Sequence, residues 1–231
     1  MANILIEYLR HKYWESADEA ESTGPVITIS RAYGCPAVEV AQELVARISA
    51  EYPQSPDILP WHWLSKEILQ ASAYELDIDP SRVEEVAAEE GRNIVKDILM
   101  SVASPEAVSD ARIRATIAHM IESVARAGNV VLVGLGGVAI TRQLRRSLHI
   151  RLQACVDWRA RRLKEQNSYS IVEARRVAQE QEIRRSEFRK RLGGGVDAHA
   201  HFDMYLNCEK FTVSEIVDLV FKAAQIRGVI S

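Results

Sequence analysis

Apolar residues follow two kinds of pattern along this chain. Short apolar runs predict β-strands, because a buried parallel strand carries few polar residues, and these runs lie at 26–30, 61–63, 130–133, 148–155 and 203–208. Apolar residues at helical spacing predict helices over 38–48, 64–74, 157–192 and 213–226, and the stretch 80–127 is also rich in helix signals. Strands separated by helices predict an α/β fold, in which a parallel sheet carries helices on both faces.

The N-terminal segment stands apart from this alternation. Residues 2–20 have helical spacing, and the polar connector 21–25 separates them from the first strand. We therefore expect residues 1–24 to form a helical extension and linker, followed by one domain over residues 25–231.

Within that domain, the pattern predicts a helical insert over about 64–127 and a helical lid over about 157–196. Asp79-Pro80 and Ser104-Pro105 are typical of helix starts, because the missing N–H of proline does no harm in a first turn. The lid helix is expected to break near 167–170.

The turn after the first strand has the architecture of a phosphate-binding loop. A loop of the form G-x-x-x-x-G-K-S/T offers backbone N–H groups, a lysine and a hydroxyl to phosphate and Mg²⁺. Here Arg31 and Pro36 stand at the two glycines, and Ala37 and Val38 stand where the lysine and hydroxyl would be. A helix N-terminus still attracts anions, and an ordinary corner between strand and helix is the alternative. The residues expected to bind nucleotide are Ser30, Arg31, Gly34, Cys35, Pro36, Ala37, Val38 and Glu39.

Arginines are concentrated in the predicted lid. Pairs three or four residues apart share a helix face and can present two guanidinium groups to one polyphosphate. The alternative is a solvated face, because glutamates are interleaved with the arginines. Three glycines at 193–195 would give a lid its hinge. The candidate catalytic arginines are Arg159, Arg162, Arg185 and Arg189.

Glycines follow the most apolar strand. Gly134, Gly136 and Gly137 allow a close approach of the backbone to a ligand, and we expect them at an acceptor site or its rim, with close packing of helix on sheet as the alternative. Arg151 and Gln153 interrupt the apolar run 148–155. This strand is therefore expected to be less central, or to face a polar layer.

Composition limits the function classes. The chain has 231 residues, of which 47% are hydrophobic, so it can bury one sizeable core. Its formal net charge of −3 argues against nucleic-acid or membrane partners that a basic field would attract. No segment approaches the roughly 20 apolar residues of a membrane span. Because the net charge is negative, an anion site must depend on a local group of positive residues.

Cysteine and histidine usage indicates neither a disulfide framework nor a metal site. The three cysteines are widely spaced and outside any C-x-x-C pattern, which favours a reducing cytosol. His199 and His201, with Asp197 and Asp203, form the one cluster with metal-ligand character, and we interpret it as a polar loop.

Four motifs in the expected order resemble the cytidylate kinase-like family of bacterial P-loop proteins, relatives of the nucleoside monophosphate kinases. The family's I-T-I-S-R-E-Y-G-S-G-G-R-E-I-A is similar to residues 27–41, and its V-I-V-G-R-G-A is similar to residues 132–137. Its lid pattern D-K-x-R-x-x-Y is similar to residues 182–188, and Y-D-L-x-I-N to residues 202–207. The likeness covers about residues 26–222.

The resemblance implies a three-layer P-loop NTPase-type fold with a helical lid, an ATP-like donor with Mg²⁺, and a nucleotide or another phosphorylated small molecule as acceptor. The chain departs from the family where phosphate would bind. It has Pro36-Ala37 for a glycine pair, Val38 and Leu135 for arginines, Ile183 for the lid lysine, and Ser65 near the position of an aspartate.

Two hypotheses follow. In the first, the protein is a phosphotransferase of the nucleoside monophosphate kinase type, whose loop 30–37 holds donor phosphates and whose lid arginines clamp the transferring group. In the second, it is a catalytically impaired descendant that acts in nucleotide sensing or protein interaction. The N-terminal helix would then dock a partner or a second subunit, which makes a homodimer one expectation.

Overall fold

The structure, a computed structural model, describes residues 24–53, 59–88, 109–192 and 202–230. The predicted N-terminal helix, the Ser104-Pro105 helix start, the glycine hinge at 193–195 and the two histidines at 199 and 201 lie outside the described residues. No helix in the described ranges has the length and apolar content needed to cross a membrane.

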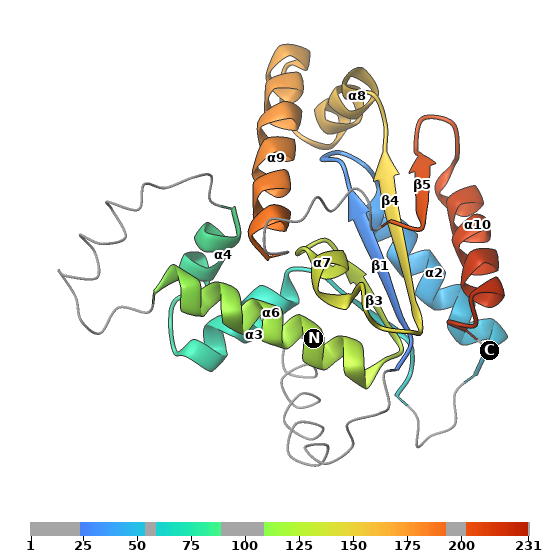
Figure 1. Ribbon diagram of the computed structural model, residues 1–231. Helices are drawn as coiled ribbons and strands as arrows, with labels where there is room; N and C mark the ends of the chain where they lie inside the picture. The colour runs from blue at the N-terminus through green and yellow to red at the C-terminus, as the bar shows by residue number, and fades with distance from the viewer. Residues whose placement is uncertain (1–23, 54–58, 89–108, 193–201, 231) are drawn as a thin grey trace.

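A five-stranded parallel sheet forms the centre of the domain (Figure 1). The strands lie in the order β2-β3-β1-β4-β5. The predicted strands are confirmed, and their bounds are β1 Val26–Arg31, β2 His62–Leu64, β3 Val130–Val133, β4 Ser147–Gln153 and β5 Met204–Asn207. All neighbouring strands run parallel, so the chain must cross over the sheet between consecutive strands, and helices form these connections.

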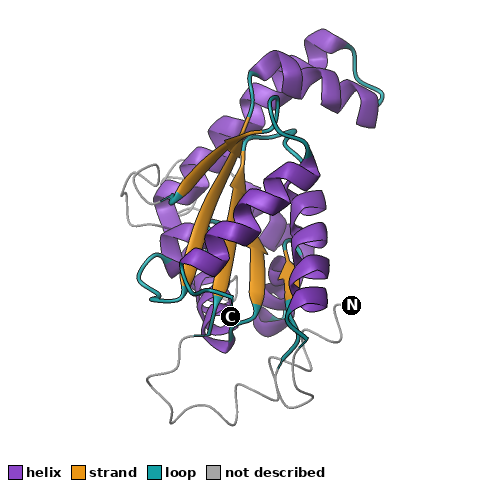
Figure 2. Cartoon of the chain, turned by 90° about the vertical axis from the view of Figure 1, so that its right-hand side faces the viewer, coloured by secondary structure: helices purple, strands orange, loops and turns teal. Residues whose placement is uncertain are grey.

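Helices cover both faces of this sheet (Figure 2). On one face, α2 and α10 pack on β1 and β4 around Ile27, Ile29 and Ile150. On the other face, α3, α4 and α6 pack around Val26, Val130 and Leu132. Their bounds are α2 Ala37–Glu51, α3 Glu67–Leu76, α4 Pro80–Ala88, α6 Asp110–Ala127 and α10 Val213–Ile226. The predicted α/β sandwich with helices on both faces is confirmed.

Local chemistry fixes several helix ends. At α10, the Thr212 hydroxyl accepts a hydrogen bond from the N–H of Glu215, and the Glu215 carboxylate accepts one from the N–H of Thr212. This capping box satisfies two N–H groups that the helix itself leaves unpaired. The start of α6 is capped by Ser109, whose hydroxyl accepts from the N–H of Arg112.

The arginine-rich segment forms two packed helices, α8 Val156–Gln166 and α9 Ile171–Leu192, with the predicted break between them. A small apolar cluster that includes Ala160, Leu163, Ala174 and Ala178 joins the two. They stand beyond the carboxyl ends of β1 and β4, and α9 contacts α4 and the short helix α7 Gly137–Thr141 (Figure 1). This places the arginine helices over the sheet edge where open α/β folds bind ligands.

For β4, the expectation of a less central position is wrong, whereas the alternative, that the strand faces a polar layer, agrees with the contacts of Arg151 to Ser30 and Glu182. This strand lies between β1 and β5 and is buried from Ser147 to Leu152. Arg151 is only 5% exposed, because its guanidinium has hydrogen-bond partners inside the protein. The arginine therefore belongs to an inner strand.

Candidate functional site

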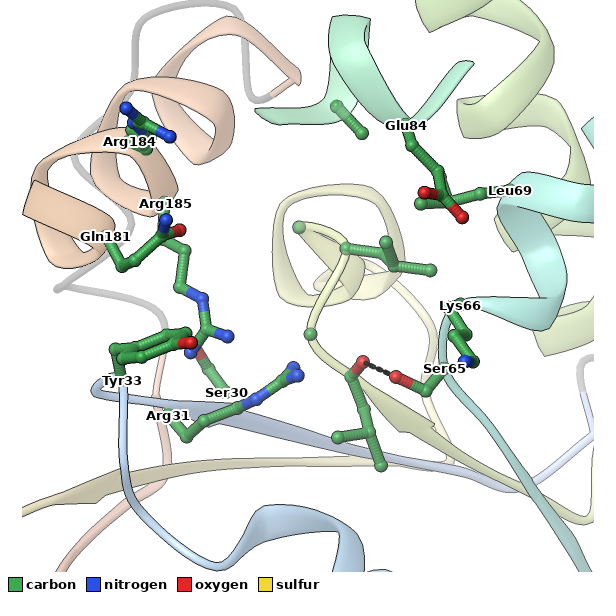
Figure 3. A pocket seen from close by; sticks show the side chains of 15 residues that line it. Ser30, Arg31, Tyr33, Ser65, Lys66, Leu69, Glu84, Gln181, Arg184 and Arg185 are labelled. Atoms are coloured by element: carbon green, nitrogen blue, oxygen red, sulfur yellow. Dashed lines mark hydrogen bonds between the residues drawn. The ribbon is translucent and has the colours of Figure 1, made fainter. Parts of the chain in front are cut away.

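A cavity of about 610 Å³ opens at the carboxyl ends of β1 and β3, between α9 on one side and α3 and α4 on the other (Figure 3). Among the described residues, four cationic side chains line it, those of Arg31, Lys66, Arg184 and Arg185, against one carboxylate, that of Glu84. The remaining lining residues are Ser30, Tyr33, Ser65, Leu69, Ala87, Val133, Gly134, Leu135, Gly136 and Gln181. The excess of cations makes the cavity suited to an anionic ligand.

Arg31 occupies the base of this cavity, and Gly134 makes room for it. Gly134 has a φ of +80°, and a Cβ atom there would lie 2.0 Å from Arg31 Nη1. A side chain at this position would therefore both strain the backbone and displace the guanidinium. The functional interpretation of Gly134 and Gly136 gains support because both line the cavity. Gly137 does not line it; it lies in the first turn of α7, where a Cβ would make ordinary contacts.

Arg185 reaches from α9 toward Arg31 and Tyr33 (Figure 3). Its guanidinium lies 4.8 Å from the centre of the Tyr33 ring, an arrangement that favours a cation–π interaction. Its Nη1 is buried and has no hydrogen-bond partner among the described residues. An unpaired buried donor costs about 1–3 kcal/mol, so a ligand oxygen at this position would be stabilising.

Electrostatics support the same conclusion. Burial lowers the pKa of Arg31 to about 9, with further lowering from the nearby charges of Arg185 and Arg151. Burial is also the main cause that lowers the pKa of Arg185. No carboxylate within the described ranges forms an ion pair with either of these two arginines. A bound anion would relieve both the desolvation and the mutual repulsion.

The predicted phosphate-binding loop is arranged differently. Three of its N–H groups are hydrogen-bonded within the protein: Cys35 N donates to Ala32 O at 3.1 Å, Ala37 N donates to Cys35 O at 2.9 Å, and Tyr33 N donates to Glu182 Oε2 at 3.1 Å. Pro36 has no N–H to offer. Of the residues predicted to bind nucleotide, Ser30 and Arg31 line the cavity, whereas Gly34, Cys35, Pro36, Ala37, Val38 and Glu39 do not.

Side chains also fill this corner. The Cys35 thiol is buried and hydrogen-bonded to the Cys208 thiol, and this bond, together with burial, raises the pKa of Cys35. Gly34 has a φ of +96°, and a Cβ atom there would lie 3.1 Å from Arg159 Cβ. The loop is thus packed against α8 and against Cys208, which directly follows β5.

The four candidate catalytic arginines separate in the structure. Arg159 is 8% exposed and donates to three backbone oxygens, Ala154 O at 3.1 Å, Tyr33 O at 3.0 Å and Ala178 O at 3.5 Å. Arg162 forms an ion pair with Glu39 at the start of α2. Arg185 lines the cavity and is joined there by Arg184. Arg189 lies in α9, and its side chain is outside what the structure describes.

Comparison of the sequence with models of known protein families identifies the family of this chain. The model of the cytidylate kinase-like family matches residues 26–210. The chain belongs to the cytidylate kinase-like family. No curated protein is matched by the sequence.

Two solved structures share the fold. One is an uncharacterized protein from Eubacterium ventriosum, with 16% identity and a TM-score of 0.59 over 87% of this chain and 98% of the other. The other is shikimate kinase from Bacteroides thetaiotaomicron, with 12% identity and a TM-score of 0.50 over the same shares of the two chains. The protein therefore has an α/β P-loop kinase-type fold, as the family assignment implies.

Sequence reasoning missed the network that lies behind the cavity in this cytidylate kinase-like protein. Arg151 Nη1 donates to Ser30 Oγ at 3.0 Å, and Arg151 Nη2 forms an ion pair with Glu182 of α9. Glu182 in turn accepts the hydrogen bond from Tyr33 N. The available signal was the arginine within an otherwise apolar strand, because a buried arginine requires partners.

The family implies ATP and Mg²⁺ use in related proteins, and the residues of this loop do not fit that pair. Ala37 and Val38 carry neither the ammonium group nor the hydroxyl that such a loop supplies, and the N–H groups of Tyr33, Cys35 and Ala37 are already hydrogen-bonded within the protein. Among the described residues, no group of three or more His, Cys, Asp or Glu side chains is placed to hold a metal ion. The polar chemistry of the site lies in the cavity instead.

Proposed function

We propose that this protein binds a phosphorylated small molecule of the nucleotide class in the cavity between β1 and β3, and that it acts by binding rather than by efficient phosphoryl transfer. The observation that carries the proposal is the buried Arg185 Nη1, which has no partner within the described part of the chain and lies beside Arg31 in a cavity with excess positive charge. A phosphoryl group supplies the acceptor oxygens and the negative charge that this wall lacks.

The other walls suit the rest of such a molecule. Leu69, Val133 and Leu135 give apolar surface, and Lys66 and Glu84 lie across the cavity from Arg185 (Figure 3). A volume of about 610 Å³ lies within the range of roughly 300–1,000 Å³ that is typical of small-molecule sites. The phosphoryl group would bind at the arginine wall, and the remainder of the ligand would lie toward α3 and α4.

The second candidate is a nucleotide-dependent phosphotransferase of the nucleoside monophosphate kinase type. It is favoured by Arg184 and Arg185, which place lid cations at the cavity, where charge on a transferring phosphoryl group would be neutralised. The occupied loop speaks against it, because losing a single preorganised donor can cost about 3 kcal/mol of transition-state stabilisation.

Calorimetric titration of nucleoside monophosphates, with and without Mg²⁺, tests the proposal. We expect one of them to bind the wild-type protein, and Arg185→Gln to weaken that binding at least tenfold, because charge-assisted hydrogen bonds contribute about 1.5–3 kcal/mol. Arg176→Gln is the matched control, since Arg176 lies on the same helix, exposed and paired with Glu180. Wild-type protein that binds no monophosphate would contradict the proposal.

An assay of ADP formation separates the two candidates. The wild-type protein is incubated at high concentration with ATP, Mg²⁺ and each monophosphate in turn. Binding without ADP formation supports the first candidate. ADP formation that depends on the monophosphate and is lost in Arg185→Gln favours the phosphotransferase.

A further inference from the structure

Glu182 places a carboxylate on the phosphate loop from outside it. The residue lies in α9, and its Oε2 accepts the hydrogen bond from Tyr33 N at 3.1 Å while its Oε1 pairs with Arg151 Nη2. The Tyr33 N–H belongs to the turn between β1 and α2, and Arg151 lies on the neighbouring strand β4. One carboxylate therefore bridges the loop backbone and a buried guanidinium.

These partners are the ones that a phosphoryl oxygen would use. Phosphate sites combine backbone N–H groups of a loop with a guanidinium group, and both are present around Glu182. The same carboxylate also acts electrostatically on the two cavity arginines, because its charge raises the pKa of Arg31 and of Arg185 against the larger lowering by burial. Three arginines thus lie close to Glu182, whose charge offsets only part of theirs.

The contact also fixes the position of the lid. Contacts between α9 and the loop include the hydrogen bond from Tyr33 N to Glu182, the packing of the Arg185 guanidinium on the Tyr33 ring, and the packing of Tyr33 against the apolar cluster of α8 and α9. All of these contacts involve Tyr33. An anion that displaced Glu182 from Tyr33 N would therefore remove a direct hydrogen bond between α9 and the loop.

We infer that Glu182 is a built-in anion that neutralises part of the positive charge beside the cavity and competes for this charge with the phosphoryl group of a ligand. The inference rests on the proposed function and deepens it, because it names what limits anion affinity at the site. In the free protein, Glu182 joins α9 to the loop through its hydrogen bond with Tyr33 N. A ligand phosphoryl group that interacts with Arg31 and Arg185 competes with this carboxylate for the same positive charge, and bound ligand loosens the contact between α9 and the loop.

Removal of the charge at position 182 tests the competition. Inorganic phosphate and pyrophosphate are titrated calorimetrically into the full-length wild-type protein and into Glu182→Gln, which keeps the size and one acceptor oxygen of the side chain. We expect the variant to bind both probes at least tenfold more tightly. Glu180→Gln is the matched control, because Glu180 lies on the same helix and pairs with the exposed Arg176; its affinities should equal those of the wild type.

The shorter acid gives a second variant in case Glu182→Gln does not fold, as judged by circular dichroism and urea unfolding. Glu182→Asp retains the charge but withdraws it from Tyr33 N by one methylene. Its affinity for pyrophosphate should lie above that of the wild type and below that of Glu182→Gln. Equal or weaker binding in the folded variant would overturn the inference.

The outcomes distinguish this inference from the proposed function. If the wild type binds a monophosphate but Glu182→Gln binds phosphate more weakly than the wild type, the proposed function stands and the competition is overturned. Glu182 would then act by positioning Arg151. Tighter binding by Glu182→Gln supports the competition even where the wild type binds phosphate too weakly to measure. No binding of any probe by any of the variants overturns both.

Discussion

Two neighbouring stretches of one turn have opposite roles in this protein. Arg31, at the end of β1, extends into the cavity beside Gly134, and its charge is only partly balanced. A few residues later, the stretch from Gly34 to Ala37 is closed by its own hydrogen bonds and by the Cys35–Cys208 contact. The comparison teaches that, in a kinase-type fold, the loop where a donor phosphate would bind can be closed while cationic side chains next to it still face a cavity.

The largest expected effect is at Gly134. In Gly134→Ala, the new methyl group meets Arg31 Nη1, and the positive φ adds about 1–3 kcal/mol of strain. We expect a lower free energy of unfolding in urea and loss of monophosphate binding. Gly137→Ala is the control, because its Cβ would have no contact closer than 3.6 Å. Equal stability of the two variants would show that Arg31 does not depend on the glycine.

Arg159→Gln tests whether the closed loop corner is held by a structural arginine. Loss of the hydrogen bonds to Ala154 O, Tyr33 O and Ala178 O should lower the free energy of unfolding by about 2–3 kcal/mol. Arg161→Gln on the exposed side of the same helix should change it by less than about 0.5 kcal/mol. Unchanged stability of Arg159→Gln, with a change in ligand binding alone, would instead support the clamp that the sequence predicts.

The titration of Arg31 provides a smaller effect. Its pKa is about 9 in the folded protein and 12.5 ordinarily, so between these values the unfolded chain binds more protons and folding becomes more favourable as pH rises. The stability of the wild type relative to Arg31→Gln should therefore increase above pH 9, by at most about 1.4 kcal/mol per pH unit. Urea unfolding at pH 8, 9 and 10 measures this difference. A constant difference would mean that the guanidinium charge is balanced in the folded state.

Periodicity and capping predict most of the fold. The bounds of α10 follow from its apolar spacing and the Thr212–Glu215 capping box, and the break between α8 and α9 follows from the polar stretch 167–170. These features are local, so the sequence alone reveals them. The inner position of β4 could not be predicted, because the partners that bury Arg151 lie on β1 and α9.

The candidate site was less predictable, for a physical reason. Arg159 and Arg185 are both arginines of one helical segment, and helical spacing treats them alike. What separates them is the environment at the end of each side chain, which is three carbonyl oxygens for Arg159 and a cavity for Arg185. Such differences depend on long-range contacts, which a pattern of residue types does not contain.

A crystal structure of the protein with the tightest-binding nucleoside monophosphate is the most direct test of the central claim. The account predicts the phosphoryl group within hydrogen-bond distance of Arg31 and Arg185, in the cavity between β1 and β3. A phosphoryl group seated on the backbone of Gly34 to Val38, at the start of α2, would contradict it.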